Sequence, residues 1–204
     1  MKRGLLLLLL LCLPPVVANE ALPEALDKAA QETASTPQLK IDGLHEVLLS
    51  MMQAGASLEA REEMLRETIL DLFDVGVIAR ISSGRSWRGF SEAEQQSLVA
   101  ALEALIVATY ADRFESYTGQ QFVSLGEAQA RTGAIVKTEI VSSAGERTPV
   151  DYYFRGDKVF NVVASGVSDL SLRRAEYSAI IKEQGLAQLL EHLAANLAET
   201  REQG

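Results

Sequence analysis

The sequence contains few of the residues from which catalytic and metal sites are usually built. Its 204 residues include one cysteine and two histidines. His45 and His192 lie far apart, and neither has a Cys, Asp or His at metal-ligand spacing. No HExxH, GxSxG, GxGxxG or Walker motif occurs. We therefore interpret both histidines as ordinary helix residues, and we expect no catalytic residue, no metal and no cofactor.

Paired acids do not change this expectation. Glu62 and Glu63 are adjacent on a predicted helix, so their carboxylates point in different directions. A mechanism with two carboxylates needs both groups to face one substrate. This pair is a poor candidate for such a site.

The single cysteine lies in a segment that we expect to be removed. Lys2 and Arg3 precede an unbroken leucine run over residues 5–11, which is too short to span a bilayer. Small residues at Val16 and Ala18 then fit a cut after Ala18. We interpret residues 1–18 as a secretory signal peptide, which predicts an exported protein without thiols.

The charge is unbalanced toward acid, with 28 Asp and Glu against 19 Lys and Arg. The leader carries two of the basic residues, so the exported chain has a net charge near −11. An anionic surface keeps a secreted protein soluble. It also disfavours nucleic acid and tight adsorption on an anionic membrane.

Helix-start signals recur through the first half of the chain. Ser57 and Asp74 are candidate N-caps. Ser91 and Glu94 have the spacing of a capping box, and apolar residues then follow at helical intervals. That stripe predicts one long helix ending near Gly119.

The period changes to two after residue 120, which predicts strands. Turns at 143–146 and 156–157 are too short for parallel crossovers, so the sequence predicts an antiparallel meander of about four strands. Helices return after Gly166, and Gly185 separates two of them. The fold class is α+β. The predicted divisions are a leader at 1–18, a mobile lead-in at 19–40 and one domain at 41–200, comprising helices at 41–118, the meander at 121–165 and C-terminal helices at 170–200.

One face of the predicted meander is apolar and must be covered by helices. We expect the apolar side of the long helix to cover this face. The candidate residues on the two sides are Val136, Ile140, Val150, Tyr152 and Phe154 on the strands, and Leu102, Leu105 and Ile106 on the helix. Periodicity allows either a filled core or a cavity for an apolar ligand between them.

Arginines gather around the only tryptophan. Arg80, Arg85 and Arg88 flank Trp87 near a short predicted helix. A guanidinium is a planar fork suited to phosphate or carboxylate. The cluster could bind a lipid head group, dock a partner, or form surface ion pairs while Trp87 covers the core.

Several short motifs follow one another in a fixed order over about residues 40–195. They are Phe73-Asp74, Ile78-Ala79-Arg80, Gly84-Arg85-Ser86-Trp87-Arg88, Thr109-Tyr110-Ala111, Tyr117-Thr118-Gly119-Gln120 and Gly166-Val167-Ser168, followed by Arg174, Tyr177, Ile180-Ile181, Gly185 and Leu189-Leu190. In this order and spacing they resemble the MlaC (toluene tolerance) family of periplasmic lipid-binding proteins, and the pattern at 108–117 is most similar to the hopanoid-associated HpnM branch.

The resemblance implies a twisted antiparallel sheet of NTF2-like type, packed by N- and C-terminal helices around an apolar pocket. It implies a non-enzymatic shuttle for phospholipid or hopanoid, working between an inner-membrane transporter and an outer-membrane lipoprotein complex. The rival hypotheses are an NTF2-like enzyme and a periplasmic adaptor without ligand. Asp157 and Asn161 stand where the family usually has tryptophan and aspartate.

We predict that the exported protein begins near Asn19. The basic start, the leucine run and the small residues before the cut motivate this boundary. Intact-mass measurement of protein recovered from the periplasm checks it. A chain that retains residues 1–18, or that carries a lipid on Cys12, would contradict the prediction.

Overall fold

The computed structural model describes residues 36–131 and 133–203. The expected signal peptide, its cysteine and most of the expected lead-in lie outside the described residues. The first described helix begins at Thr36, inside the range expected for the lead-in.

Helices precede and follow a single sheet, in the α+β order expected from the sequence. The elements are α2 (Thr36–Ala54), α3 (Leu58–Leu72), α4 (Val75–Ser82), the 3₁₀ helix η1 (Gly84–Gly89), α5 (Glu92–Arg113), β1 (Gln121–Ala130), β2 (Gly133–Val141), β3 (Arg147–Arg155), β4 (Lys158–Ala164), β5 (Val167–Ser168) and α6 (Asp169–Gln203).

The predicted helix caps are present. The Ser57 hydroxyl accepts a hydrogen bond from the Ala60 amide, and the Asp74 carboxylate accepts one from the Val77 amide at 3.0 Å. At the start of α5, Ser91 and Glu94 each accept from the other's backbone N–H, which completes the capping box. These local bonds satisfy amides that the helix itself cannot.

One of the two long helices differs from its predicted course, and the other bends at the glycine expected between two helices. α5 ends at Arg113, not near Gly119, because the backbone leaves the helical region at Phe114. α6 is helical on both sides of Gly185, where φ is 86° and the chain bends. A positive φ suits glycine, so this residue lets two helical arms follow each other directly.

The sheet is an antiparallel meander in the order β1-β2-β3-β4-β5. It has one strand more than expected, because two residues after the Ser165-Gly166 turn pair back onto β4. β1 is the longest strand of the sheet, with 10 residues. Its register shifts between Ser124 and Gly126, and the positive φ of Gly126 allows pairing to continue past this bulge.

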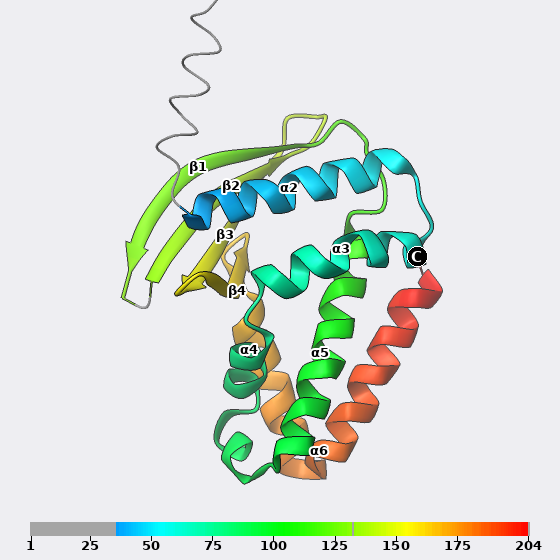
Figure 1. Ribbon diagram of the computed structural model, residues 1–204, viewed down its shortest axis with the longest axis vertical. Helices are drawn as coiled ribbons and strands as arrows, with labels where there is room; N and C mark the ends of the chain where they lie inside the picture. The colour runs from blue at the N-terminus through cyan, green and yellow to red at the C-terminus, as the bar shows by residue number, and fades with distance from the viewer. Residues whose placement is uncertain (1–35, 132, 204) are drawn as a thin grey trace, which may run out of the picture. The chain divides into compact units, whose positions relative to one another are not determined.

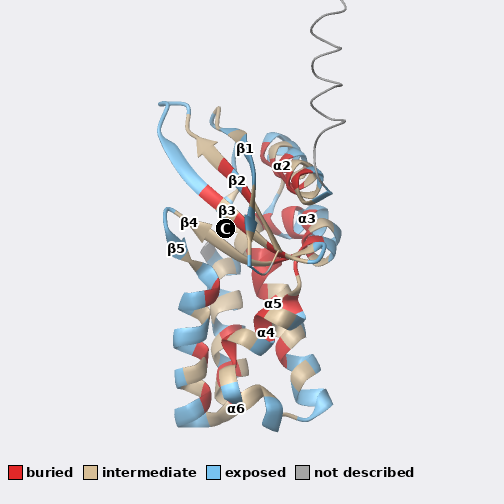
Figure 2. Cartoon of the chain, turned by 90° about the vertical axis from the view of Figure 1, so that its left-hand side faces the viewer, coloured by how far each residue is buried: buried red, intermediate tan, exposed pale blue. Residues whose placement is uncertain are grey.

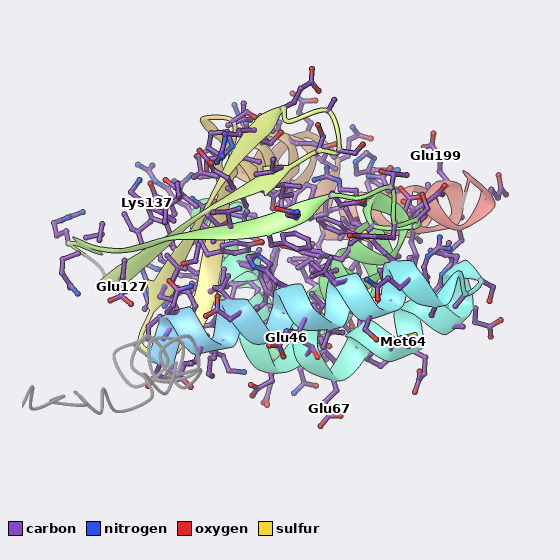
Figure 3. All side chains as sticks on the ribbon, turned by 90° about the horizontal axis from the view of Figure 1, so that it is seen from above. Glu46, Met64, Glu67, Glu127, Lys137 and Glu199 are labelled. Carbon is purple, nitrogen blue, oxygen red and sulfur yellow. The ribbon has the colours of Figure 1, made fainter. Side chains whose placement is uncertain are left out.

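The helices cover one face of the sheet. Figure 1 shows α2 running across the sheet, with α5 and the second arm of α6 side by side below it. Buried residues gather where these elements meet (Figure 2). Charged side chains such as Glu67 on α3 point away from the sheet (Figure 3). The apolar face therefore has the helical cover that the sequence required. Within the described residues, none of the helices has the length and apolarity that crossing a membrane would take.

Two charged side chains of α3 are buried and tie distant elements together. Arg61 donates to the carbonyl oxygens of Ala111 and Ala56 at 2.9 and 2.8 Å. Glu62 accepts two hydrogen bonds from Arg201 at 2.9 and 2.7 Å. This second pair joins α3 to the end of α6.

Arg201→Met is expected to destabilise the protein by about 2 kcal/mol, because it leaves the Glu62 carboxylate buried without its bidentate partner. The Glu62 side chain is 6% exposed and that of Arg201 is 47% exposed, so solvent screens part of the loss. Urea unfolding measures the change. The double variant Glu62→Met/Arg201→Met should recover most of the stability, and a double variant as unstable as the single one would contradict this account.

Candidate functional site

A cavity of about 420 Å³ lies between the inner face of the sheet and the helices. Its walls come from α4, α5, β2, β3, β4, β5 and the first turns of α6. The cavity is therefore assembled from both halves of the chain. Its size is in the range of small-molecule pockets, roughly 300–1,000 Å³.

The helical wall is largely aromatic and aliphatic. Tyr110 lies in the last turn of α5, Phe114 directly follows that helix, and Phe73 joins α3 to α4. The rings of Phe73 and Tyr110 meet edge to face at 5.6 Å, and those of Tyr110 and Phe114 are 6.1 Å apart. Such a wall offers apolar surface and little capacity for hydrogen bonding.

Four of the eight residues predicted to contact an apolar ligand line this cavity: Ile106, Ile140, Val150 and Tyr152. The other four, Leu102, Leu105, Val136 and Phe154, do not line it and are buried in the surrounding core. Alternation on the strands identified the inward face correctly. It could not distinguish side chains against the cavity from those against helices.

The mouth of the cavity is marked by exposed side chains among its lining residues. Val167 and Leu172 are 54% and 58% exposed, although both are apolar. Thr148 on β3 and Arg113 at the end of α5 are also exposed. The opening thus lies where the β5 turn and the start of α6 face the C-terminal end of α5.

Charges at this mouth are unevenly paired. Asp169 accepts a hydrogen bond from Arg173 at 2.6 Å, and Arg173 also donates to the Tyr177 hydroxyl at 3.1 Å. Burial alone would lower the pKa of Arg173, but these partners hold it above its usual value. Arg113 forms no ion pair within the described part of the chain. It is the cation left available at the opening.

Asn161, one of the two departures from the family pattern, has a structural role. Its side-chain oxygen accepts from the Leu170 amide at 3.1 Å and from the Ser168 hydroxyl at 3.0 Å. It thereby satisfies the start of α6 and holds that helix at the cavity wall. Asp157, the other departure, lies in the exposed β3–β4 turn and pairs with Lys40 at 3.3 Å.

His45 lies behind the cavity wall. It stacks on Phe122 with ring centroids 4.2 Å apart, and its Nε2 is 3.5 Å from the Tyr152 hydroxyl. Burial lowers the pKa of His45 to about 4. Burial also raises the pKa of Tyr152 and of Tyr110. All three side chains are therefore neutral at pH 7, and the wall carries no charge there.

The titratable side chains at and near the cavity are mostly engaged by partners. Its one lining carboxylate, Asp169, is held by Arg173, and neither histidine lines it. His192 lies on α6 against Glu176, and Glu62 is committed to Arg201. Over the described ranges, 36–131 and 133–203, no three His, Cys, Asp or Glu side chains are grouped as metal ligands would be.

The predicted arginine cluster is elsewhere. Arg80, Arg85, Arg88 and Trp87 do come together, but around a separate groove, and none of them lines the cavity. Sequence reasoning also did not predict the lining residues that follow β3 in the chain. They are Phe160, Asn161, Val162, Ala164, Val167, Asp169, Leu170, Leu172 and Arg173. The Gly166-Val167-Ser168 motif was the available signal, since it begins the turn that forms the mouth.

Comparison with known proteins adds to this geometry. The family model described as MlaC protein matches residues 42–195. A solved structure of similar fold is that of the phospholipid-binding protein from Ralstonia solanacearum in complex with a phospholipid. It covers 80% of this chain and 97% of its own, with a TM-score of 0.69 and 19% sequence identity, a likeness that shows the fold. Comparison with curated proteins finds no match.

His45→Phe is expected to flatten the pH dependence of stability between pH 7 and pH 5. The histidine has a pKa near 4 when folded and about 6.5 when unfolded, so the unfolded chain takes up the proton first. The contribution of this neutral histidine to the free energy of unfolding is present near pH 7 and falls by about 2 kcal/mol by pH 5. Urea unfolding at both pH values measures this. Equal losses in wild type and variant would show that the buried ring is not responsible.

Proposed function

This chain belongs to the MlaC family, and from that membership we propose that it is a periplasmic carrier that holds the acyl part of a lipid in the cavity beneath its sheet. The observation that carries the proposal is a cavity with aromatic and aliphatic walls and with charged groups among its exposed lining residues. The phospholipid complex of the Ralstonia solanacearum protein supports the choice of ligand class.

The cavity matches the physical problem of moving a lipid through water. Each methylene exposed to water costs about 0.8 kcal/mol, so a lipid needs an apolar enclosure while it is away from a membrane. Phe73, Tyr110 and Phe114 supply such a surface on the helical side, and Val150 and Val162 supply it on the sheet side. The head group can remain at the mouth, in contact with solvent.

The mouth favours a ligand with an anionic group. Arg113 lacks an ionic partner among the described residues and lies at the opening, where it could donate to a phosphate. The Tyr110 hydroxyl, neutral because burial raises its pKa, is a further donor inside the cavity. A phospholipid fits these groups best. A hopanoid, suggested by the likeness to the HpnM branch, would use the same apolar walls without needing Arg113.

Transport would follow from the same properties. The acidic surface keeps the loaded protein from adsorbing on anionic membranes, so it can leave one membrane and reach another. The family resemblance supplies the expected partners, an inner-membrane lipid transporter and an outer-membrane lipoprotein complex. The expected signal peptide accounts for the proposed location in the periplasm.

The two rival hypotheses are less well supported. An enzyme on this scaffold would need an acid or base facing the cavity, whereas the lining carboxylate Asp169 is engaged by Arg173. An adaptor with a filled core would not leave 420 Å³ of apolar space behind an open mouth. Binding is therefore the function that the geometry supports best.

Ala164→Trp is expected to remove most of the lipid that the protein retains. Ala164 lines the cavity from β4, and an indole there would occupy space needed by acyl carbons. Displacing two methylenes costs about 1.6 kcal/mol, which lowers retention roughly tenfold. Mass spectrometry of lipid extracted from purified protein measures it, and identifies phospholipid or hopanoid at the same time.

The matched control is Ala175→Trp, the same change at an exposed position on α6 that does not line the cavity. It should retain lipid as wild type does. Thermal unfolding must show that both variants fold. Wild-type protein that yields no lipid even after incubation with phospholipid vesicles would refute the proposed function. Full retention by Ala164→Trp would refute the proposed location.

A further inference from the structure

A second hollow, of about 710 Å³, is bordered by five arginines. Arg80 lies at the end of α4, and Arg85 and Arg88 belong to η1. Arg155 comes from the end of β3 and Arg174 from the first arm of α6. Trp87, Ile81 and Gly84 complete its border. We call these eight residues the arginine groove.

The arginines of the groove lack the carboxylate partners that four other arginines of the described residues have. Arg66, Arg147, Arg173 and Arg201 each pair with a carboxylate. In the part of the chain that the structure describes, none of the groove arginines does so. Arg155 instead lies over the ring of Phe160, at 5.0 Å. A protein with 28 acidic residues thus keeps five cations together and unneutralised.

Local structure does not account for this gathering. The C-terminal ends of α4 and η1 favour a cation, which explains Arg80 and Arg88 one at a time. It does not explain why a strand and a later helix bring Arg155 and Arg174 to the same hollow. Like charges placed together repel each other, so the arrangement is costly unless an anion occupies it.

We propose that the arginine groove is a docking site for an acidic, Asp- and Glu-rich segment of a partner protein. A guanidinium binds a carboxylate through two parallel hydrogen bonds, which suits a row of such side chains. The remainder of the surface is acidic and repels such a segment, so the groove also fixes where the partner lands. The site is distinct from the lipid cavity, and its occupant need not be lipid.

The form of the groove favours a peptide over a bilayer. Trp87 is half-buried, meets Phe90 edge to face at 6.3 Å, and has its carbonyl bound by the Gln95 side chain at 3.2 Å. These contacts make Trp87 part of the border of the groove. A flat anionic surface would reach the rim of a hollow and would meet the acidic remainder of the protein.

Trp87 also provides the measurement, because it is the only tryptophan in the sequence. An octaglutamate peptide should change its fluorescence in a saturable way, and octaglutamine should not. Affinity is obtained from the anisotropy of dye-labelled octaglutamate. The affinity should fall steeply as the salt concentration rises from about 0.05 to 0.5 M, since screening weakens exposed ion pairs.

The variant Arg80→Gln/Arg85→Gln/Arg88→Gln should weaken octaglutamate binding roughly tenfold or more. Arg155 is left in place, because Phe160 beneath it lines the lipid cavity. The matched control is Arg66→Gln/Arg131→Gln/Arg147→Gln, which removes the same charge from exposed positions outside the groove. Thermal unfolding verifies that both variants fold, and lipid retention should equal wild type in both.

Three results would overturn the proposal. Octaglutamate could leave Trp87 unaffected, which would mean that the groove does not bind acidic peptide. The control variant could lose as much affinity as the groove variant, which would show that binding depends on the net charge of the protein and not on the groove. Phosphatidylglycerol vesicles could bind through the groove while the peptide does not, which would make it a membrane contact. None of these results bears on whether the cavity holds lipid, so the two proposals can fail separately.

Discussion

A continuous series of aromatic rings is the contact on which the interior of this protein depends. It runs from Phe73 to Tyr110, Phe114 and Phe122, and then through His45 to Tyr152, with successive centroids 4.2 to 6.1 Å apart. These rings belong to α2, α5, β1, β3 and the α3–α4 junction. Aromatic rings are wide and stiff, so they keep the helices and the sheet apart. Aliphatic side chains at the same positions would let the two layers pack closer together.

This separation leaves a cavity between the sheet and the helices. Phe73, Tyr110, Phe114 and Tyr152 face the cavity, while His45 and Phe122 support the wall from behind. Burial keeps His45, Tyr110 and Tyr152 neutral, so the polar atoms on this path do not introduce charge beside an apolar ligand. Charged groups occur at the mouth, where Asn161 fixes the start of α6 and Arg113 faces solvent.

The cavity and the arginine groove lie against the same part of the chain but are chemically opposite. Arg173 lines the cavity and Arg174 borders the groove, although they are neighbours on α6. Phe160 faces the cavity while Arg155 rests on its ring. The proposed carrier function needs one surface that excludes water and another that recognises a partner. Because they are separate sites with no lining residue in common, an anion in the groove would not meet a ligand in the cavity.

The sequence alone determined the elements whose signals are local. Ser57, Asp74 and the Ser91–Glu94 pair predict helix starts, because a capping side chain bonds to an amide only a few residues away. Alternation predicts the inward face of a strand, because successive side chains point to opposite sides of the sheet. Family motifs extended this to the fold. The tertiary structure decided what depends on the distance between elements: the cavity in place of a filled core, its mouth at α6, and the addition of Arg155 and Arg174 to the three arginines near Trp87. Periodicity records which way a side chain points and not what lies opposite it, so these features required the packed molecule.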